Sequence, residues 1–296
     1  MGMSRGYSDS DTGQAKSIRS LHRVLEAAMK HREPNEAATA AHERLFPGHV
    51  SSLAVTDPEL IEYFDNFAFD EVLRHSADLP ERTRLMTQLA AMIGVGAVAE
   101  YRIMLGAALT IGVTPVEAKE IVYQAVPYAG MARVFDFLHA TNEALTDHSV
   151  RLPLEGRSTT TPATRMAKGL AVQKRIVGNE TVDALYANAP EDQQHIQELL
   201  SGNCFGDHYT RTGLDIPTRE LLTFAMLAAL GGADAQVRGH VAANLNVGNT
   251  RATLIAVLTG LLPFIGYPRT LNALSALDAV APSSSGAGDS GPKDEA

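Results

Sequence analysis

Apolar residues along the chain recur with the spacing of an α-helix, and no stretch alternates apolar and polar residues as a β-strand would. SIRSLHRVLEAAMKH at 17–31 is the first such run. The pattern therefore predicts an all-α protein. Residues 1–16 and 282–296 lack this periodicity and are rich in small and polar residues, so we predict that both are disordered tails.

The chain contains an internal repeat. Segments that begin at Gly112 and Gly248 align at a constant offset of 136, which matches Thr114/Thr250, Pro127/Pro263, Gly130/Gly266, Arg133/Arg269 and Leu138/Leu274. Upstream the offset is 137, which matches Pro80/Pro217, Arg82/Arg219, Leu85/Leu222 and Gly94/Gly231. A duplication explains this register. We predict two tandem domains at 17–145 and 164–281, joined by a polar linker at 146–163.

Each copy predicts the same four helices, because Pro, Thr and Gly stand at matching positions where helices start or stop. The expected positions are 80–94, 97–110, a start at 114, and 131 to about 145 in the first copy, and 217–231, 233–246, a start at 250, and 268 to about 280 in the second. Thr114 and Glu117 have the spacing of a capping box. Pro127 and Pro263 predict a kink or a stop.

Charge and cysteine content narrow the function. A net charge of −9 and a pI near 5.6 argue against nucleic-acid binding, so the expected partners are small molecules and further copies of the chain. The single cysteine, Cys204, excludes an internal disulfide and is expected to be buried and inert. The histidines show no metal-ligand spacing, so we expect no metal. The N-terminus lacks a secretory pattern, and no uncharged apolar stretch reaches the ~20 residues of a membrane span, so we expect a cytoplasmic protein.

One polar row stands out in the run GGADAQVRGHVAANLNVGNT at 231–250. Gln236, His240 and Asn244 follow one another at four-residue intervals, which places them in one row on a helix surface. Such a row is either a solvated face or the wall of an active site, and the spacing leaves both interpretations open. Among the aromatic residues, we expect core or pocket-wall positions for Tyr128, Phe264 and Tyr267.

The second copy, LDIPTRELLTFAMLAALGGADAQVRGHVAANLNVG followed by LLPFIGYPRTLNAL, resembles the carboxymuconolactone decarboxylase family. That family shares its all-helical fold with the alkylhydroperoxidase D proteins. The first copy, AEYRIMLGAALTIGVTPVEAKEIVYQAVPYAG, resembles the same domain. The resemblance covers roughly residues 40–145 and 165–280 and implies a tandem-domain member with this fold. The family includes decarboxylases, peroxidases and members whose substrates are unknown.

The resemblance implies a site in the second copy. The family's glutamate and histidine match Glu220 and His240. A carboxylate that hydrogen-bonds an imidazole fixes its tautomer and supports its cation, so this pair is expected to be catalytic. Gln236, Asn244 and Arg219 are the candidate substrate-binding residues. The alternatives are a solvated face for the two amides and a surface ion pair for Arg219.

The resemblance also implies that this chain lacks several functional residues of the family. The peroxidase branch needs a Cys-x-x-Cys that ends four residues before the histidine, and those two positions are Ala233 and Gln236 here. Decarboxylase-like members often have a glutamate at the second of these positions. In the first copy the glutamate and histidine positions are Thr83 and Met104, although Glu100 occupies the place of Gln236. We therefore predict that the first copy is non-catalytic.

Together these residues predict a lyase or isomerase that needs no cofactor and acts on a small carboxylated lactone or β-keto-type acid by acid–base chemistry of His240 and Glu220. The alternative is a non-catalytic binding or assembly module that keeps the fold. A third is an alkyl hydroperoxide reductase-like protein without the cysteine pair. Single-domain members of the family form rings, which implies a homo-oligomer here, expected to be a trimer with six domains.

Overall fold

The computed structural model describes residues 33–283. The expected helix at 17–31, the expected tail at 1–16 and nearly all of the expected tail at 282–296 lie outside the described residues. Within the described range the chain is helical and contains no strand, which confirms the all-α prediction. The chain divides into two compact units, one ending at Glu71 and the other beginning at Val72.

The first unit is small. It contains α2 (Glu36–Leu45), α3 (Leu53–Thr56), α4 (Pro58–Asn66) and the π-helical turn η1 (Phe67–Glu71). The Asn35 side chain caps α2 by accepting a hydrogen bond from the Ala38 N–H. The rings of His42, Phe46 and Phe69 pack together with centroids 5.0 to 5.8 Å apart. Phe46 and Phe69 are buried, so the rings form part of the interior of the unit.

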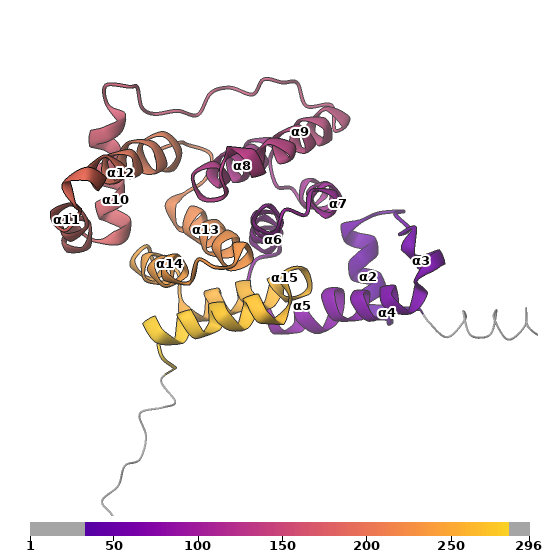
Figure 1. The fold of residues 1–296 in the computed structure, drawn as a ribbon. Coiled ribbons are helices and arrows are strands. Elements are labelled where there is room, and N and C mark those ends of the chain that lie inside the picture. The colour runs from indigo at the N-terminus through magenta and orange to yellow at the C-terminus, as the bar shows by residue number, and fades with distance from the viewer. Residues whose placement is uncertain (1–32, 284–296) are drawn as a thin grey trace, which may run out of the picture. The chain divides into compact units, whose positions relative to one another are not determined.

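The second unit holds most of both repeat copies (Figure 1). Its first-copy elements are α5 (Val72–His75), α6 (Glu81–Val95), α7 (Val98–Thr110), α8 (Pro115–Ala129) and α9 (Met131–Asp147). Its later elements are α10 (Arg165–Val177), α11 (Asn179–Ala187), η2 (Glu191–Gln193), α12 (Gln194–Leu199), η3 (Leu200–Tyr209), α13 (Ile216–Leu230), α14 (Asp234–Asn246) and α15 (Arg251–Val280). The helices expected from the repeat lie within two residues of their predicted starts and ends, with the last two of the second copy merged into α15.

Caps and glycines explain several of these boundaries. Thr114 and Glu117 form the predicted capping box at the start of α8. The predicted kink occurs at a repeated glycine instead of at the proline three residues before it. In α15 the backbone breaks at Gly266, where φ is 76°, and in the first copy α8 ends before Gly130, where φ is 79°. Glycine adopts a positive φ without a steric penalty, so it sets the position of the turn.

The two copies meet where α6 crosses α13. Gly94 was expected to end a helix, but α6 continues to Val95 and is capped by Gly96. A Cβ on Gly94 would lie 2.6 Å from the Met226 carbonyl oxygen and 2.9 Å from the Ala229 Cβ. The absence of a side chain at Gly94 therefore allows close approach of the two helices, in addition to its position one residue before the end of α6.

The copies share one core, because α8 and α15 each pack against both α6 and α13. Within the described residues, α15 is the one helix that is long and apolar enough to cross a membrane. It is broken at Gly266, and 44% of its most apolar window is buried inside the protein. Since a long core helix passes the same test of length and composition, we interpret α15 as a core element. The linker predicted at 146–163 contains no helix after Asp147.

Candidate active site

Glu220 and His240 come together at the packed faces of α13 and α14. The Asp215 side chain caps α13 by accepting from the Thr218 N–H, and Glu220 lies in the second turn of this helix. His240 Nδ1 lies 2.8 Å from Glu220 Oε2. The glutamate is fully buried, and the histidine side chain is 15% exposed. Because a carboxylate accepts hydrogen bonds, Nδ1 carries the proton of the neutral ring and Nε2 is left as its basic nitrogen.

Tyr209, the last residue of η3, holds the other oxygen of this carboxylate. Its hydroxyl donates to Glu220 Oε1 at 2.7 Å, accepts from the Tyr128 hydroxyl at 3.0 Å, and lies 2.9 Å from Thr223 Oγ1. Burial, reinforced by the charge of Glu220, raises the pKa of Tyr209 well above its usual value. The phenol therefore keeps its proton, and the carboxylate is fixed by donors on both oxygens.

The first copy contributes one wall of this site. Tyr128, from α8, packs edge-on against the His240 ring with centroids 5.5 Å apart and an interplanar angle of 76°. Burial is the main cause that raises the pKa of Tyr128. Its hydroxyl is engaged by Tyr209, so its ring is the part that faces the imidazole. Of the other aromatic residues expected in a core or wall, Phe264 packs against the core and Tyr267 is 61% exposed, so the expectation for Tyr267 was wrong.

A line of buried polar contacts continues from this site into the first copy. Gln124 Nε2 donates to Thr223 Oγ1 at 3.2 Å, and its Oε1 accepts from Arg219 at 2.9 Å. Arg219 also donates to Glu120 Oε2 at 2.9 Å, and Arg211 pairs with the same carboxylate at 2.8 Å. One buried glutamate of the first copy is thus bound by two arginines of the second.

Arg219, one of the candidate substrate-binding residues, lies inside the protein. The residue is fully buried, and besides Gln124 and Glu120 it donates to the Arg211 carbonyl at 2.9 Å. Its ion pair is therefore buried, whereas the alternative considered from the sequence was a surface ion pair. These contacts join the two copies, and the guanidinium presents no surface to solvent.

The polar row at 236, 240 and 244 passes from solvent into the interior. Gln236 is exposed, His240 is partly buried and Asn244 is fully buried. Asn244 Nδ2 donates to the Glu220 and His240 carbonyls at 3.1 and 2.7 Å, and its Oδ1 accepts from Asn249 at 2.8 Å. Asn244 thus ties α14 to α13. Gln236, one turn before His240, is the most exposed member of the row.

The single cysteine, Cys204, lies close to this site. Cys204 is buried, with its Sγ 3.7 Å from the Tyr128 hydroxyl oxygen, and burial raises the pKa of its thiol to about 12. The thiol is buried as expected.

In the first copy, Met104 is buried and Glu100 is partly buried, with its pKa raised by that burial. Across residues 33–283 no group of three or more His, Cys, Asp or Glu side chains is arranged to hold a metal ion.

The sequence contained one unused signal for these contacts. Glu120, Gln124 and Tyr128 follow one another at four-residue intervals along α8, the same spacing as the row that contains His240. A polar row on an otherwise apolar helix indicates buried hydrogen bonding or a site. Tyr209 gave no such signal, because it ends a π-helical segment outside the helices expected from the repeat.

Comparison with known proteins identifies the family of the chain. The profile of the carboxymuconolactone decarboxylase family matches the chain twice, at residues 58–143 and 194–279. The chain therefore belongs to the carboxymuconolactone decarboxylase family and carries two of its domains in tandem. One curated relative is the 4-carboxymuconolactone decarboxylase of Acinetobacter baylyi. It is 30% identical over 116 residues, which cover 39% of this chain and 86% of the relative.

Proposed function

We propose that this protein is a cofactor-independent decarboxylase or isomerase that acts on a small carboxylated lactone or β-keto-type acid. The observation that carries the proposal is the His240–Glu220 hydrogen bond, in which the carboxylate is buried and the imidazole is partly accessible. A buried carboxylate that holds Nδ1 stabilises the imidazolium and directs Nε2 outward as an acid or base. The name of the Acinetobacter relative supports a decarboxylation.

In the proposed decarboxylation, the bond between the carboxylate carbon and the neighbouring carbon breaks and carbon dioxide leaves. The bonding electrons pass to the conjugated carbonyl oxygen and form an enolate. The His240 imidazolium then delivers the Nε2 proton to the carbon that lost the carboxylate, and a proton from solvent restores the imidazolium. The negative charge of Glu220 stabilises the His240 imidazolium that forms in this way.

The proposed isomerisation uses the same groups, because His240 removes a proton from one carbon and returns it to another. In either reaction we assign the exposed Gln236, one turn before His240 on α14, as the donor of a hydrogen bond to an enolate oxygen. Asn244 is not part of this proposal, because its amide is engaged by backbone carbonyls and Asn249.

The alternative, a binding or assembly module that keeps the fold, would not need a buried carboxylate behind a partly exposed imidazole. The extra donor on Glu220 from Tyr209 also favours catalysis, since it orients the acid that orients the base. The peroxidase alternative is disfavoured because its reactive thiols are missing. Ala233 and Gln236 stand at the positions of the cysteine pair, and the thiol of Cys204 is buried with a raised pKa.

The chain is further proposed to form a homo-oligomer, with a trimer as the expected state. Supporting this, both copies expose large apolar residues at matching positions in the first turns of their last helix segments. These are Met131 and Phe135 in the first copy and Tyr267 and Leu271 in the second. Matching apolar faces on both domains suit a closed ring, in which each domain buries the same face against a neighbour.

The catalytic proposal is tested by direct assay with 4-carboxymuconolactone, following release of carbon dioxide. Substitution His240→Ala is expected to lower kcat by about 10²- to 10⁴-fold, the usual contribution of a general acid or base. The matched control is His195→Ala, which removes an exposed imidazole from the second copy and should leave kcat unchanged. Equal turnover by wild type and His240→Ala would remove His240 from the mechanism.

A further inference from the structure

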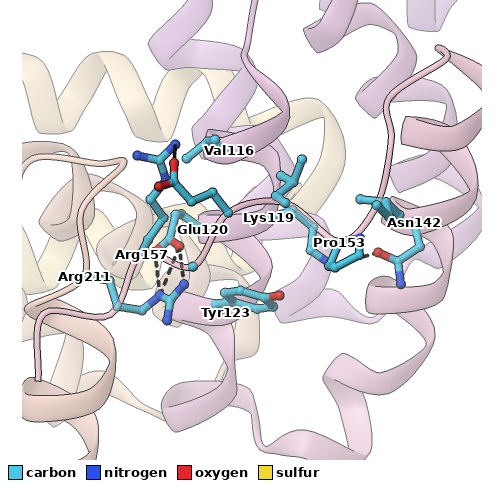
Figure 2. A pocket seen from close by; sticks show the side chains of 12 residues that line it. Val116, Lys119, Glu120, Tyr123, Asn142, Pro153, Arg157 and Arg211 are labelled. Carbon is cyan, nitrogen blue, oxygen red and sulfur yellow. Dashed lines mark hydrogen bonds and ion pairs between the residues drawn. The ribbon is translucent and has the colours of Figure 1, made fainter. Parts of the chain in front are cut away.

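A separate cavity lies between α8, α9, residues 152–157 and Arg211 (Figure 2). Its volume is about 370 Å³, within the range of small-molecule pockets. His240, Glu220 and the two tyrosines that surround them are not among its lining residues. The cavity is therefore distinct from the candidate active site, and nothing in the proposed reaction assigns it a role.

The charge of the lining is positive. Lys119, Arg157 and Arg211 face two acids, Glu120 and Glu155. The Glu120 carboxylate is buried and neutralised twice, by Arg211 inside the lining and by Arg219 behind it. The Glu155 side chain is 84% exposed and stands 3.7 Å from Arg157, which is long for a strong ion pair. A locally positive cavity in a chain with a net charge of −9 favours an anionic ligand.

Two of the cations keep hydrogen-bond donors for a ligand. Lys119 Nζ donates to Asn142 Oδ1 at 2.7 Å, which uses one of its three protons. Arg157 Nε is buried and finds no hydrogen-bond partner among the described residues. A buried donor without a partner is unfavourable, and an acceptor brought by a ligand would satisfy it. Arg211 is different, because Nε and one terminal nitrogen are already bound to Glu120.

The remaining lining is apolar and aromatic. Leu152, Pro153 and Leu154 form one side, and the Tyr123 ring lies beneath two of the cations, with its centroid 5.1 Å from Lys119 Nζ and 4.9 Å from Arg211 Cζ. The segment after these residues is tied down, since the Thr212 N–H donates to the Arg157 carbonyl at 3.1 Å. An apolar wall beside a few placed cations suits a ligand with a flat or short apolar body and an anionic end.

We propose that this cavity binds a small organic carboxylate, with the carboxylate between Lys119 and Arg157 and the apolar body against Leu152, Leu154 and Tyr123. The guanidinium of Arg157 offers a planar pair of donors to a carboxylate, and the Lys119 ammonium adds a second positive charge. This site is independent of the proposed reaction at His240.

The test uses the full-length protein and isothermal titration calorimetry with benzoate, with benzamide as a neutral ligand of the same shape. Benzoate is expected to bind with a Kd in the millimolar range or below, and benzamide at least tenfold more weakly. Arg157→Gln and Lys119→Gln are each expected to weaken benzoate binding at least tenfold. The matched control is Arg102→Gln, which removes an exposed arginine paired with Glu143 on the first-copy helices and should leave the Kd unchanged.

Two results would overturn the proposal. One is no heat of benzoate binding at 10 mM ligand, on the order of the weakest affinity expected for so small a molecule. The other is benzoate binding that survives both Arg157→Gln and Lys119→Gln, or that benzamide matches. Circular dichroism of each variant establishes that it is folded, and because two different cations are tested, misfolding of one variant leaves the other to decide. Loss of activity in His240→Ala does not bear on either result.

Discussion

Substitution Tyr209→Phe removes one hydroxyl from the centre of the buried polar network. That hydroxyl donates to Glu220 at 2.7 Å, accepts from Tyr128 at 3.0 Å and contacts Thr223 at 2.9 Å. All other atoms of the ring are retained, so the loss of packing is small. The substitution thus reports on the hydrogen bonds of the network.

The expected cost follows from what each neighbour loses. A hydrogen bond to a charged group contributes about 1.5 to 3 kcal/mol, and Glu220 Oε1 would be left buried without this donor. The Tyr128 hydroxyl would lose its acceptor, which adds to the cost if no other acceptor replaces it. We therefore expect the free energy of unfolding to fall by about 2 to 4 kcal/mol. For a protein of this size each kcal/mol lowers Tm by roughly 2 to 4 °C.

Chemical denaturation followed by circular dichroism measures this change. The matched control is Tyr63→Phe, which deletes the same atom from a tyrosine that is 59% exposed and should change stability by less than about 0.5 kcal/mol. Tyr209→Phe should also lower kcat, because Glu220 loses one of the two donors that fix it. If Tyr209→Phe were as stable as Tyr63→Phe, the buried network around Glu220 would not have the structural role described.

Four further predictions can be tested separately. Gly94→Ala should destabilise the protein by about 1 to 3 kcal/mol, because the new Cβ meets the backbone of α13. Gly106→Ala should instead stabilise it by about 0.5 to 1 kcal/mol, because Gly106 lies inside α7 with open space around the new Cβ; urea denaturation measures both changes. Cys204 should react with a thiol reagent such as 5,5′-dithiobis(2-nitrobenzoate) only after denaturation, because its pKa is raised to about 12, and fast reaction of the native protein would contradict its burial. The buried Tyr101, Tyr128 and Tyr209 have raised pKa values, so their protonated forms stabilise the fold fully below about pH 10, and this stabilisation is lost as the pH rises further. Absorbance at 295 nm should show that these tyrosines ionise cooperatively as the protein unfolds. Independent ionisation of all tyrosines near pH 10 in folded protein would refute this prediction. Light scattering at micromolar concentration should return a multiple of 31.6 kDa, and the monomer mass would exclude the proposed assembly.

The sequence predicted the helices well where start and stop residues repeat. Thr114 with its capping box and the matching glycines at 130 and 266 set boundaries that are local in origin, so they follow from a few residues. Gly94 was interpreted only as the end of a helix, which α6 reaches one residue later, and its packing role was missed. Its actual role depends on α13, which lies more than a hundred residues further along the chain.

The site was predictable only in part. The resemblance to a family pointed to Glu220 and His240, and the structure places them 2.8 Å apart. Periodicity placed Asn244 on the same row as His240 but could not show that α13 covers that end of the row. The pairing of Arg219 with Glu120 and the approach of Tyr128 to His240 depend on the packing of one copy against the other. Helical spacing within one copy carries no information about those contacts.

The claim that His240 and Glu220 act as one acid–base unit is tested most directly by a double-mutant comparison of kcat with 4-carboxymuconolactone. His240→Ala and Glu220→Gln should each reduce turnover, and the double variant should be no slower than His240→Ala alone, because the glutamate acts through the histidine. Reductions that multiply in the double variant would show that the two residues act independently. Wild-type turnover no faster than the spontaneous reaction would contradict the catalytic assignment for this substrate.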